Sequence, residues 1–95
     1  MSYHSSLQIN GTEYCFDMGG IETSKSLRSH DARDGAPRMN TQVIPMGKSN
    51  RTGYMLTQDI GHLFERNTYD LVKKNCNSFA DAGLYYLLGK RMPKS

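Results

Sequence analysis

The amino-acid sequence predicts an α+β fold in which short antiparallel strands pack with two main helices. An Asn-Gly pair separates two alternating segments near the N-terminus, which is typical of a β-hairpin. Apolar residues recur at helical spacing in two segments of the second half. The length of 95 residues corresponds to a single domain, 1–95, near the small end of the usual size range.

Residues 4–17 predict the hairpin. Asn10 and Gly11 are the preferred pair for a two-residue type I′ turn, because both positions need positive φ. In this register most apolar side chains share one face, which we expect to face the core: Leu7, Ile9, Tyr14 and Phe16. His4 then lies across from Asp17 on the opposite, polar face.

The chain after the hairpin contains few regular patterns. Gly19 and Gly20 predict a sharp exit from the sheet. Residues 22–42 are polar and rich in Ser, Arg and Asp, which predicts a long exposed loop. Residues 43–46 predict a short strand at a sheet edge, since Pro45 cannot donate to a central ladder.

Two helices are expected in the second half. Thr57 is the predicted N-cap of the first, which runs to about Arg66. Residues 69–72 predict a short strand that leads into the second helix. Asn75 is the predicted N-cap of that helix and Gly89 its stop signal. Its buried face is predicted from the spacing of Cys76, Phe79, Ala80, Gly83, Leu84, Leu87 and Leu88.

The charge and hydropathy patterns exclude several classes of protein. The net charge is +3, but the 12 basic residues are scattered among nine acidic ones. Without a basic stripe carrying aromatic residues, no nucleic-acid partner is expected. No apolar run approaches the roughly 18 residues of a membrane span.

The number and spacing of the cysteines bear on the cellular compartment and on metal binding. Two cysteines are too few for a disulfide scaffold, and the first residues lack the apolar segment of a signal peptide. We therefore expect a cytoplasmic protein, able also to enter the nucleus, with reduced thiols. No His/Cys cluster has zinc spacing, so we expect neither a metal nor a cofactor.

One of the two cysteines, Cys76, lies where the second helix is expected to begin. A thiol beside the positive end of a helix, near a cationic histidine, can have its pKa lowered from ~8.5 to about 3.5–7.5. On the residues alone, two interpretations stay open: a small apolar residue of the core, or a nucleophile with a histidine base. His4 is the best-placed histidine, because His30 lies in the polar loop and His62 on a helix surface.

The order of motifs is specific. His-Ser-Ser-Leu-Gln-Ile-Asn-Gly-Thr-Glu-Tyr-Cys-Phe-Asp-Met-Gly-Gly-Ile (4–21) is followed by Tyr-Asp-Leu-Val-Lys-Lys-Asn-Cys-Asn-Ser-Phe (69–79) and Gly-Lys-Arg-Met-Pro (89–93). This combination resembles the PPPDE superfamily, the DeSI-type cysteine isopeptidases, over nearly the whole chain. The resemblance implies a papain-like fold, permuted so that the histidine precedes the cysteine.

The resemblance also implies an activity. His4 would be the general base and Cys76 the nucleophile of a thiol protease. Members of the family remove SUMO or ubiquitin from protein lysines (deSUMOylation or deubiquitination), and similar thioesterases remove palmitate from cysteine. We therefore expect an isopeptidase that acts on SUMO- or ubiquitin-conjugated proteins. The alternatives are a protein S-depalmitoylating thioesterase and a catalytically inactive binding module.

Several supporting residues have two interpretations each. Asn75 and Asn77 could assist catalysis or merely cap the helix, whereas the amide of Cys76 is a natural oxyanion donor. Asp17 could orient His4, as in a catalytic triad, or form a surface ion pair across the strands. Tyr3 could line a substrate groove or pack as a strand aromatic.

Gly19 and Gly20 could let an extended substrate tail approach the backbone, although tight turning explains them equally well. The chain also departs from the family at its N-terminus. Relatives carry a strand ahead of the histidine, whereas only Met1-Ser2-Tyr3 precede it here. We expect that the chain is a shortened form lacking that N-terminal strand, or that another segment or a partner, such as a second copy in a homodimer, covers the exposed edge.

Overall fold

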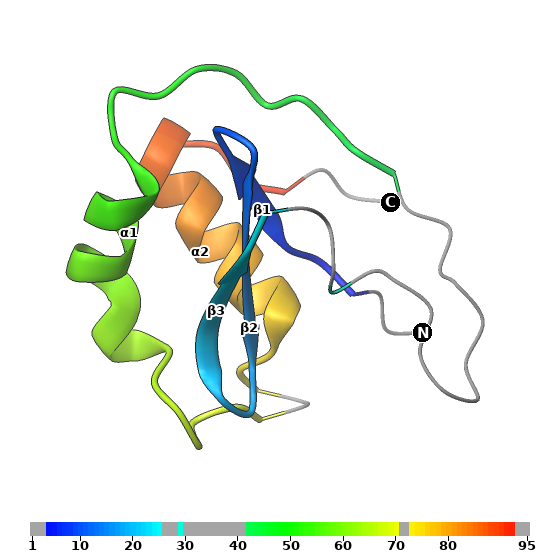
Figure 1. The fold of residues 1–95 in the computed structure, drawn as a ribbon, viewed down its shortest axis with the longest axis vertical. Helices are drawn as coiled ribbons and strands as arrows, with labels where there is room; N and C mark the ends of the chain where they lie inside the picture. The colour runs from blue at the N-terminus through cyan, green and yellow to red at the C-terminus, as the bar shows by residue number, and fades with distance from the viewer. Residues whose placement is uncertain (1–3, 26–28, 30–41, 71–72, 93–95) are drawn as a thin grey trace.

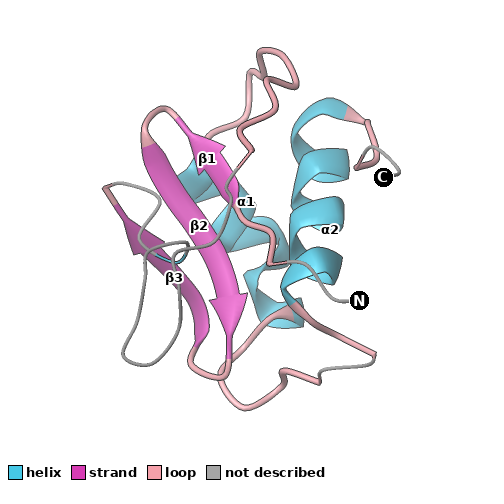
Figure 2. Cartoon of the chain, turned by 90° about the vertical axis from the view of Figure 1, so that its right-hand side faces the viewer, coloured by secondary structure: helices cyan, strands magenta, loops and turns pink. Residues whose placement is uncertain are grey.

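A three-stranded antiparallel sheet and two α-helices form the fold of this computed structural model (Figure 1, Figure 2). The structure describes residues 4–25, 29, 42–70 and 73–92. The elements are β1 (Leu7–Ile9), β2 (Thr12–Asp17), β3 (Gly20–Ser24), α1 (Gly53–Ile60), a 3₁₀ turn η2 (Gly61–Leu63) and α2 (Cys76–Leu88). The strand order is β1-β2-β3, α2 packs against β2, and α1 packs against α2. The predicted α+β class is confirmed.

The predicted hairpin is also confirmed, with its register. Asn10 and Gly11 have φ values of 51° and 83°, and Leu7 pairs with Tyr14. The assigned ladder of β1 begins at Leu7, so the expected pairing of His4 with Asp17 lies beyond it. Phe16 is fully buried, as expected for the apolar face.

The expected exit from the sheet at Gly19 and Gly20 is wrong. Asp17 Oδ1 accepts a hydrogen bond from the Gly19 amide at 2.8 Å, and Gly20 has a φ of 95°. These two features reverse the chain tightly, and it returns as β3, paired along the whole of β2 from Glu13 onwards. Residues 22–24 of the expected loop are therefore strand, while 26–28 and 30–41 lie outside the described residues.

The expected strand at residues 43–46 is wrong as well. This segment has no regular structure and is mostly exposed. Hydrogen bonds from and to the end of α2 hold the chain around it: Lys90 Nζ donates to the Met46 carbonyl at 2.9 Å, and Ser49 Oγ to the Leu87 carbonyl at 2.6 Å. Because Pro45 removes a backbone donor, contacts of this kind replace a β-ladder.

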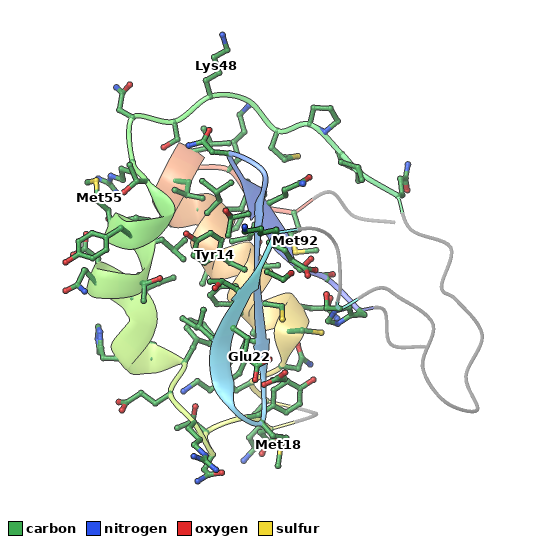
Figure 3. All side chains as sticks on the ribbon, in the orientation of Figure 1. Tyr14, Met18, Glu22, Lys48, Met55 and Met92 are labelled. Carbon is green, nitrogen blue, oxygen red and sulfur yellow. The ribbon has the colours of Figure 1, made fainter. Side chains whose placement is uncertain are left out.

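The first helix begins earlier than expected. Its N-cap is Thr52, whose Oγ1 accepts from the Met55 amide at 3.1 Å, and not Thr57. A Cβ on Gly53 would lie 2.1 Å from the Tyr14 hydroxyl oxygen, so glycine allows the helix to start directly against the sheet. Figure 3 shows Tyr14 in this position, between the sheet and α1.

The second helix agrees with the prediction at both ends. Asn75 is its N-cap, in a capping box with Ser78, and Gly89 ends it with a left-handed φ of 69°. The strand expected at 69–72 is wrong: only an isolated bridge joins Asp70 and Lys74, and residues 71–72 lie outside the described part of the chain.

Aromatic rings dominate the core. Phe16 and Phe64 lie 5.0 Å apart between ring centroids, and Phe64 and Phe79 lie 5.2 Å apart. The α2 backbone comes close to the sheet at Gly83, where a Cβ would lie 2.4 Å from Leu7 Cδ1. Within the ranges that the structure describes, the longest helix has 13 residues, and none has the length and apolar character to cross a membrane.

The polar face of β2 is buried too. Glu13 is only 1% exposed, and its carboxylate accepts hydrogen bonds from Ser6, Ser24 and the backbone and side chain of Ser29. Burial by itself raises the pKa of Glu13, but the hydrogen bonds outweigh burial and leave the pKa below its ordinary value. Ser29 thus lies against the same face of the sheet as the Glu13 side chain.

Candidate active site

Cys76 is the first residue of α2 and is 7% exposed. The Asn75 cap fixes this start, because its Oδ1 accepts from the amides of Asn77 and Ser78 at 3.0 and 3.1 Å. In return, Ser78 Oγ accepts from the Asn75 amide at 3.2 Å. The side chain of Asn75 is therefore engaged in capping, which accounts for its presence structurally, and the amide of Cys76 is not among the groups it caps.

The segment that carries His4 lies beside this helix start. Ser5 Oγ donates a hydrogen bond to Oδ1 of Asn77. This contact joins the residue after His4 to the residue after Cys76, 72 positions apart in the sequence. Figure 2 shows the segment ahead of β1 passing the N-terminal end of α2. His4 itself is partly exposed, but its Nε2 atom is buried.

Tyr69 is a further side chain at the site, and the sequence analysis did not single it out. Its phenol lies near enough to Cys76 for the backbone amide and the sulfur of that residue to influence the pKa of the phenol. Burial raises the pKa of the Tyr69 phenol, and negative charge on the Cys76 sulfur raises it further. In the sequence, Tyr69 could be noticed only as the first residue of the 69–79 motif. That motif indicated the family resemblance but not that Tyr69 lies near Cys76.

Two local contacts hold Tyr69 in place. The backbone amides of Asp70 and Lys74 each donate to the other residue's carbonyl, at 2.7 and 2.9 Å, and close the chain into a loop ahead of the helix. The Tyr69 ring packs on Phe16 with a centroid distance of 5.2 Å. The loop and the core ring together direct the phenol toward the start of α2.

Asp17 is the last residue of β2. Its Oδ1 closes the β2–β3 turn through the Gly19 amide. Its charge also contributes to raising the pKa values of Tyr69 and of Cys15, so it acts electrostatically on both faces of the sheet. The turn contact gives Asp17 a structural role, and its action on His4 stays a prediction.

Gly19 and Gly20 line an open hollow of about 440 Å³ together with residues of the α1 end, including Thr57, His62 and Phe64. Packing against backbone atoms and a positive φ explain Gly20, whereas the nearest atom to Gly19 is the end of a flexible side chain. A Cβ on Gly20 would lie 3.0 Å from the Arg66 amide nitrogen, and one on Gly19 would lie 2.8 Å from Glu22 Oε1. Neither Cys76 nor His4 is among the residues that line this hollow. Its use as a substrate groove stays a prediction, and Tyr3 lies outside the described residues.

The second cysteine lies in a different environment. Cys15 is on the back of β2 and is 7% exposed. Burial, with the carboxylates of Glu13, Asp17 and Glu22 nearby, raises the pKa of Cys15 to about 11. Among the described residues, no three His, Cys, Asp or Glu side chains lie close enough together to hold a metal ion.

A comparison with known protein families identifies one that matches the chain. The family described as "PPPDE putative peptidase domain" matches residues 1–95. Because the match covers the whole sequence, the chain belongs to the PPPDE family. The three-stranded sheet and two helices are consistent with that domain. No curated protein matches the chain.

Proposed function

We propose that the chain is a cysteine isopeptidase that releases a ubiquitin-like modifier, SUMO or ubiquitin, from protein lysines. Cys76 is the nucleophile and His4 the general base. The observation that carries this proposal is the Ser5–Asn77 hydrogen bond, which brings the segment of His4 to the helix end that carries Cys76. Membership of a peptidase family supports the same chemistry.

The start of α2 favours a reactive sulfur. The partial positive charge of a helix N-terminus stabilises a thiolate, and a nearby histidine can accept the thiol proton. His4 takes the proton of Cys76, and the resulting imidazolium remains beside the sulfur as a proton donor.

The reaction proceeds in two steps. The Cys76 sulfur attacks the C-terminal carbonyl of the modifier, and the carbon–nitrogen bond breaks as His4 returns its proton to the lysine amine. The product is a thioester between Cys76 and the modifier. Water then attacks this thioester while His4 accepts a proton, and the modifier leaves with a free carboxylate as Cys76 is regenerated.

A cleavage assay tests the proposal. Ubiquitin or SUMO linked to a lysine peptide is incubated with the wild type, Cys76→Ala, His4→Ala and Cys15→Ala. We expect cleavage of one modifier by the wild type and Cys15→Ala, none by Cys76→Ala, and a large loss in His4→Ala. Folded wild-type protein that cleaves neither conjugate contradicts the proposal; release of palmitate from a thioester substrate by the same protein would favour the depalmitoylating alternative.

A further inference from the structure

We propose that a basic surface around the C-terminal end of α2 is a docking site for an acidic segment of a protein partner. The surface carries four exposed cations: Lys48, Arg51, Lys90 and Arg91. α2 has 13 residues, so this end lies roughly 18 Å along the helix from Cys76, at about 1.5 Å per residue. The surface is separate from the proposed active site, and its function does not depend on the proposed reaction.

Two segments that are far apart in the sequence form the basic surface. Residues 46–51 cross the end of α2, where Arg51 Nη1 donates to the Tyr86 carbonyl at 2.8 Å. Lys90 Nζ, just beyond the helix, donates to the Met46 carbonyl at 2.9 Å. Figure 1 shows the crossing segment, in green, passing over the orange end of α2. These bonds hold the cations of both segments together at one end of the helix.

Two of the cations are stacked on aromatic rings. The guanidinium carbon of Arg51 lies 4.5 Å from the ring centroid of Tyr86, and that of Arg91 lies 4.6 Å from the ring centroid of Tyr85. A guanidinium that is held against a ring is already oriented before a ligand arrives. Binding therefore costs less side-chain entropy than it would for freely moving arginines.

The stacked arginines keep hydrogen-bond donors for a ligand. A guanidinium has five N–H donors in a planar fork. Among the residues that the structure describes, Arg51 uses Nη1 on the Tyr86 carbonyl, and Arg91 uses Nη1 on Asp81 Oδ2 at 2.8 Å. The remaining N–H groups match the two oxygens of a carboxylate, which guanidinium groups bind in bidentate pairs.

Nearby acidic residues do not cancel the positive charge. Asp81 is already engaged, because it accepts hydrogen bonds from Arg91 and from the Met92 amide, and these bonds hold its pKa below the ordinary value. Within the described ranges, no carboxylate forms an ion pair with Lys48 or Lys90. The surface thus has an excess of positive charge, which attracts an acidic ligand.

The composition of the surface favours a protein segment over a nucleic acid. Tyr85 is 55% exposed beside Arg91, and tyrosine and arginine are the residue types that most often dominate protein–protein interfaces. Bases of a single strand would bind by stacking on aromatic faces. Here an arginine covers one face of each of the two tyrosines, Tyr85 and Tyr86.

Charge reversal at Lys48 tests the proposal. Figure 3 shows Lys48 pointing away from the body of the protein, so Lys48→Glu changes the charge without disturbing packing. Lys73→Glu is the matched control, because it makes the same change just ahead of the other end of α2. Arg91→Lys keeps the net charge but removes the planar group that stacks on Tyr85.

Binding is measured at low ionic strength by the fluorescence anisotropy of a labelled glutamate-rich peptide, with a peptide carrying glutamine in place of each glutamate for comparison. We expect the wild type to prefer the glutamate peptide. Lys48→Glu should weaken its binding about 5–30-fold, since an attraction is replaced by a repulsion of similar size. Arg91→Lys should weaken it about 2–5-fold, the size of one exposed cation–π contact, and Lys73→Glu should match the wild type.

The same experiment has clear contrary outcomes. Equal affinity for the two peptides, or no binding by folded wild-type protein, overturns the proposal. So does an equal loss in Lys48→Glu and Lys73→Glu, because the attraction would then come from net charge alone. Single-stranded oligouridylate that binds more tightly than the glutamate peptide, and loses affinity in Lys48→Glu, would assign the surface to nucleic acid and overturn the proposal as well.

Discussion

The hydroxyl of Ser5 donates a hydrogen bond to the side-chain oxygen of Asn77, and this bond connects two segments that lie 72 positions apart in the sequence. Ser5 precedes β1, and Asn77 is the second residue of α2. Each is the chain neighbour of a residue proposed to carry the chemistry, His4 or Cys76. In the proposed mechanism, the alignment of base and nucleophile therefore depends on a contact between their neighbours.

Ser5→Ala should lower activity more than stability. Loss of one part-buried hydrogen bond costs about 0.5–1.5 kcal/mol of unfolding free energy. Misplacement of the base should raise the activation free energy of cleavage by more than this amount, and so lower kcat. Urea titration and the cleavage assay measure the two effects. Ser6→Ala is the control, because Ser6 bonds Glu13 instead; an equal loss of kcat in both variants would contradict the alignment role.

The two thiols should differ in reactivity. The pKa of Cys15 is raised to about 11 by burial and by neighbouring carboxylates, so iodoacetamide at pH 7.5 should leave it unmodified while Cys76, at the start of a helix, reacts. Mass spectrometry of the digested protein would identify the alkylated residue. Both cysteines should be modified after denaturation, and preferential labelling of Cys15 in the folded chain would be the opposite of this expectation.

Glu13 should make stability dependent on pH. Its pKa is lowered in the fold from an ordinary value of 4.5, so its contribution to stability is present above that value and is lost as pH falls through the folded-state pKa. Glu13→Gln should cost about 1–3 kcal/mol at neutral pH through imperfect pairing of the buried group.

Thermal melts between pH 3 and pH 7 would compare Glu13→Gln with the wild type. The two melting temperatures should converge toward the acidic end, because the wild-type carboxyl is then protonated as well. A constant difference across this range would show that the charge of Glu13 does not contribute.

Gly83 should resist enlargement. A Cβ there would lie 2.4 Å from Leu7 Cδ1 and 3.1 Å from Leu56 Cδ1, so Gly83→Ala should cost about 1–3 kcal/mol through overpacking between α2 and the sheet. Chemical denaturation measures this cost. In the double variant Leu7→Ala/Gly83→Ala the two costs should be less than additive; full additivity would mean that the side chains do not compete for space.

Local signals were sufficient for two parts of the fold. The hairpin follows from Asn10 and Gly11, whose positive φ values few other pairs would accept. The second helix follows from Asn75 and Gly89, each of which satisfies groups at a helix end. In both cases the deciding interactions lie within a few residues along the chain, so the sequence pattern contains them.

The remaining elements depend on contacts between distant residues. Gly53 is a poor helix former, but the first helix can begin there because Tyr14 of the sheet leaves no room for a side chain at this position. The position of Tyr69 against Cys76 depends on the chain reversal at the Asp70–Lys74 bridge. The cysteine could be identified from its place before an apolar helix, but the phenol could not, since its site exists only after the chain has folded.

The most direct test of the account is the position of a covalent adduct. Folded protein is treated with ubiquitin and with SUMO carrying a C-terminal propargyl group, and the modified residue is mapped by mass spectrometry in the wild type and in His4→Ala. The account predicts a single thioether at Cys76 with one modifier, formed much more slowly in His4→Ala. No adduct with either modifier, or equal rates with and without His4, would contradict it.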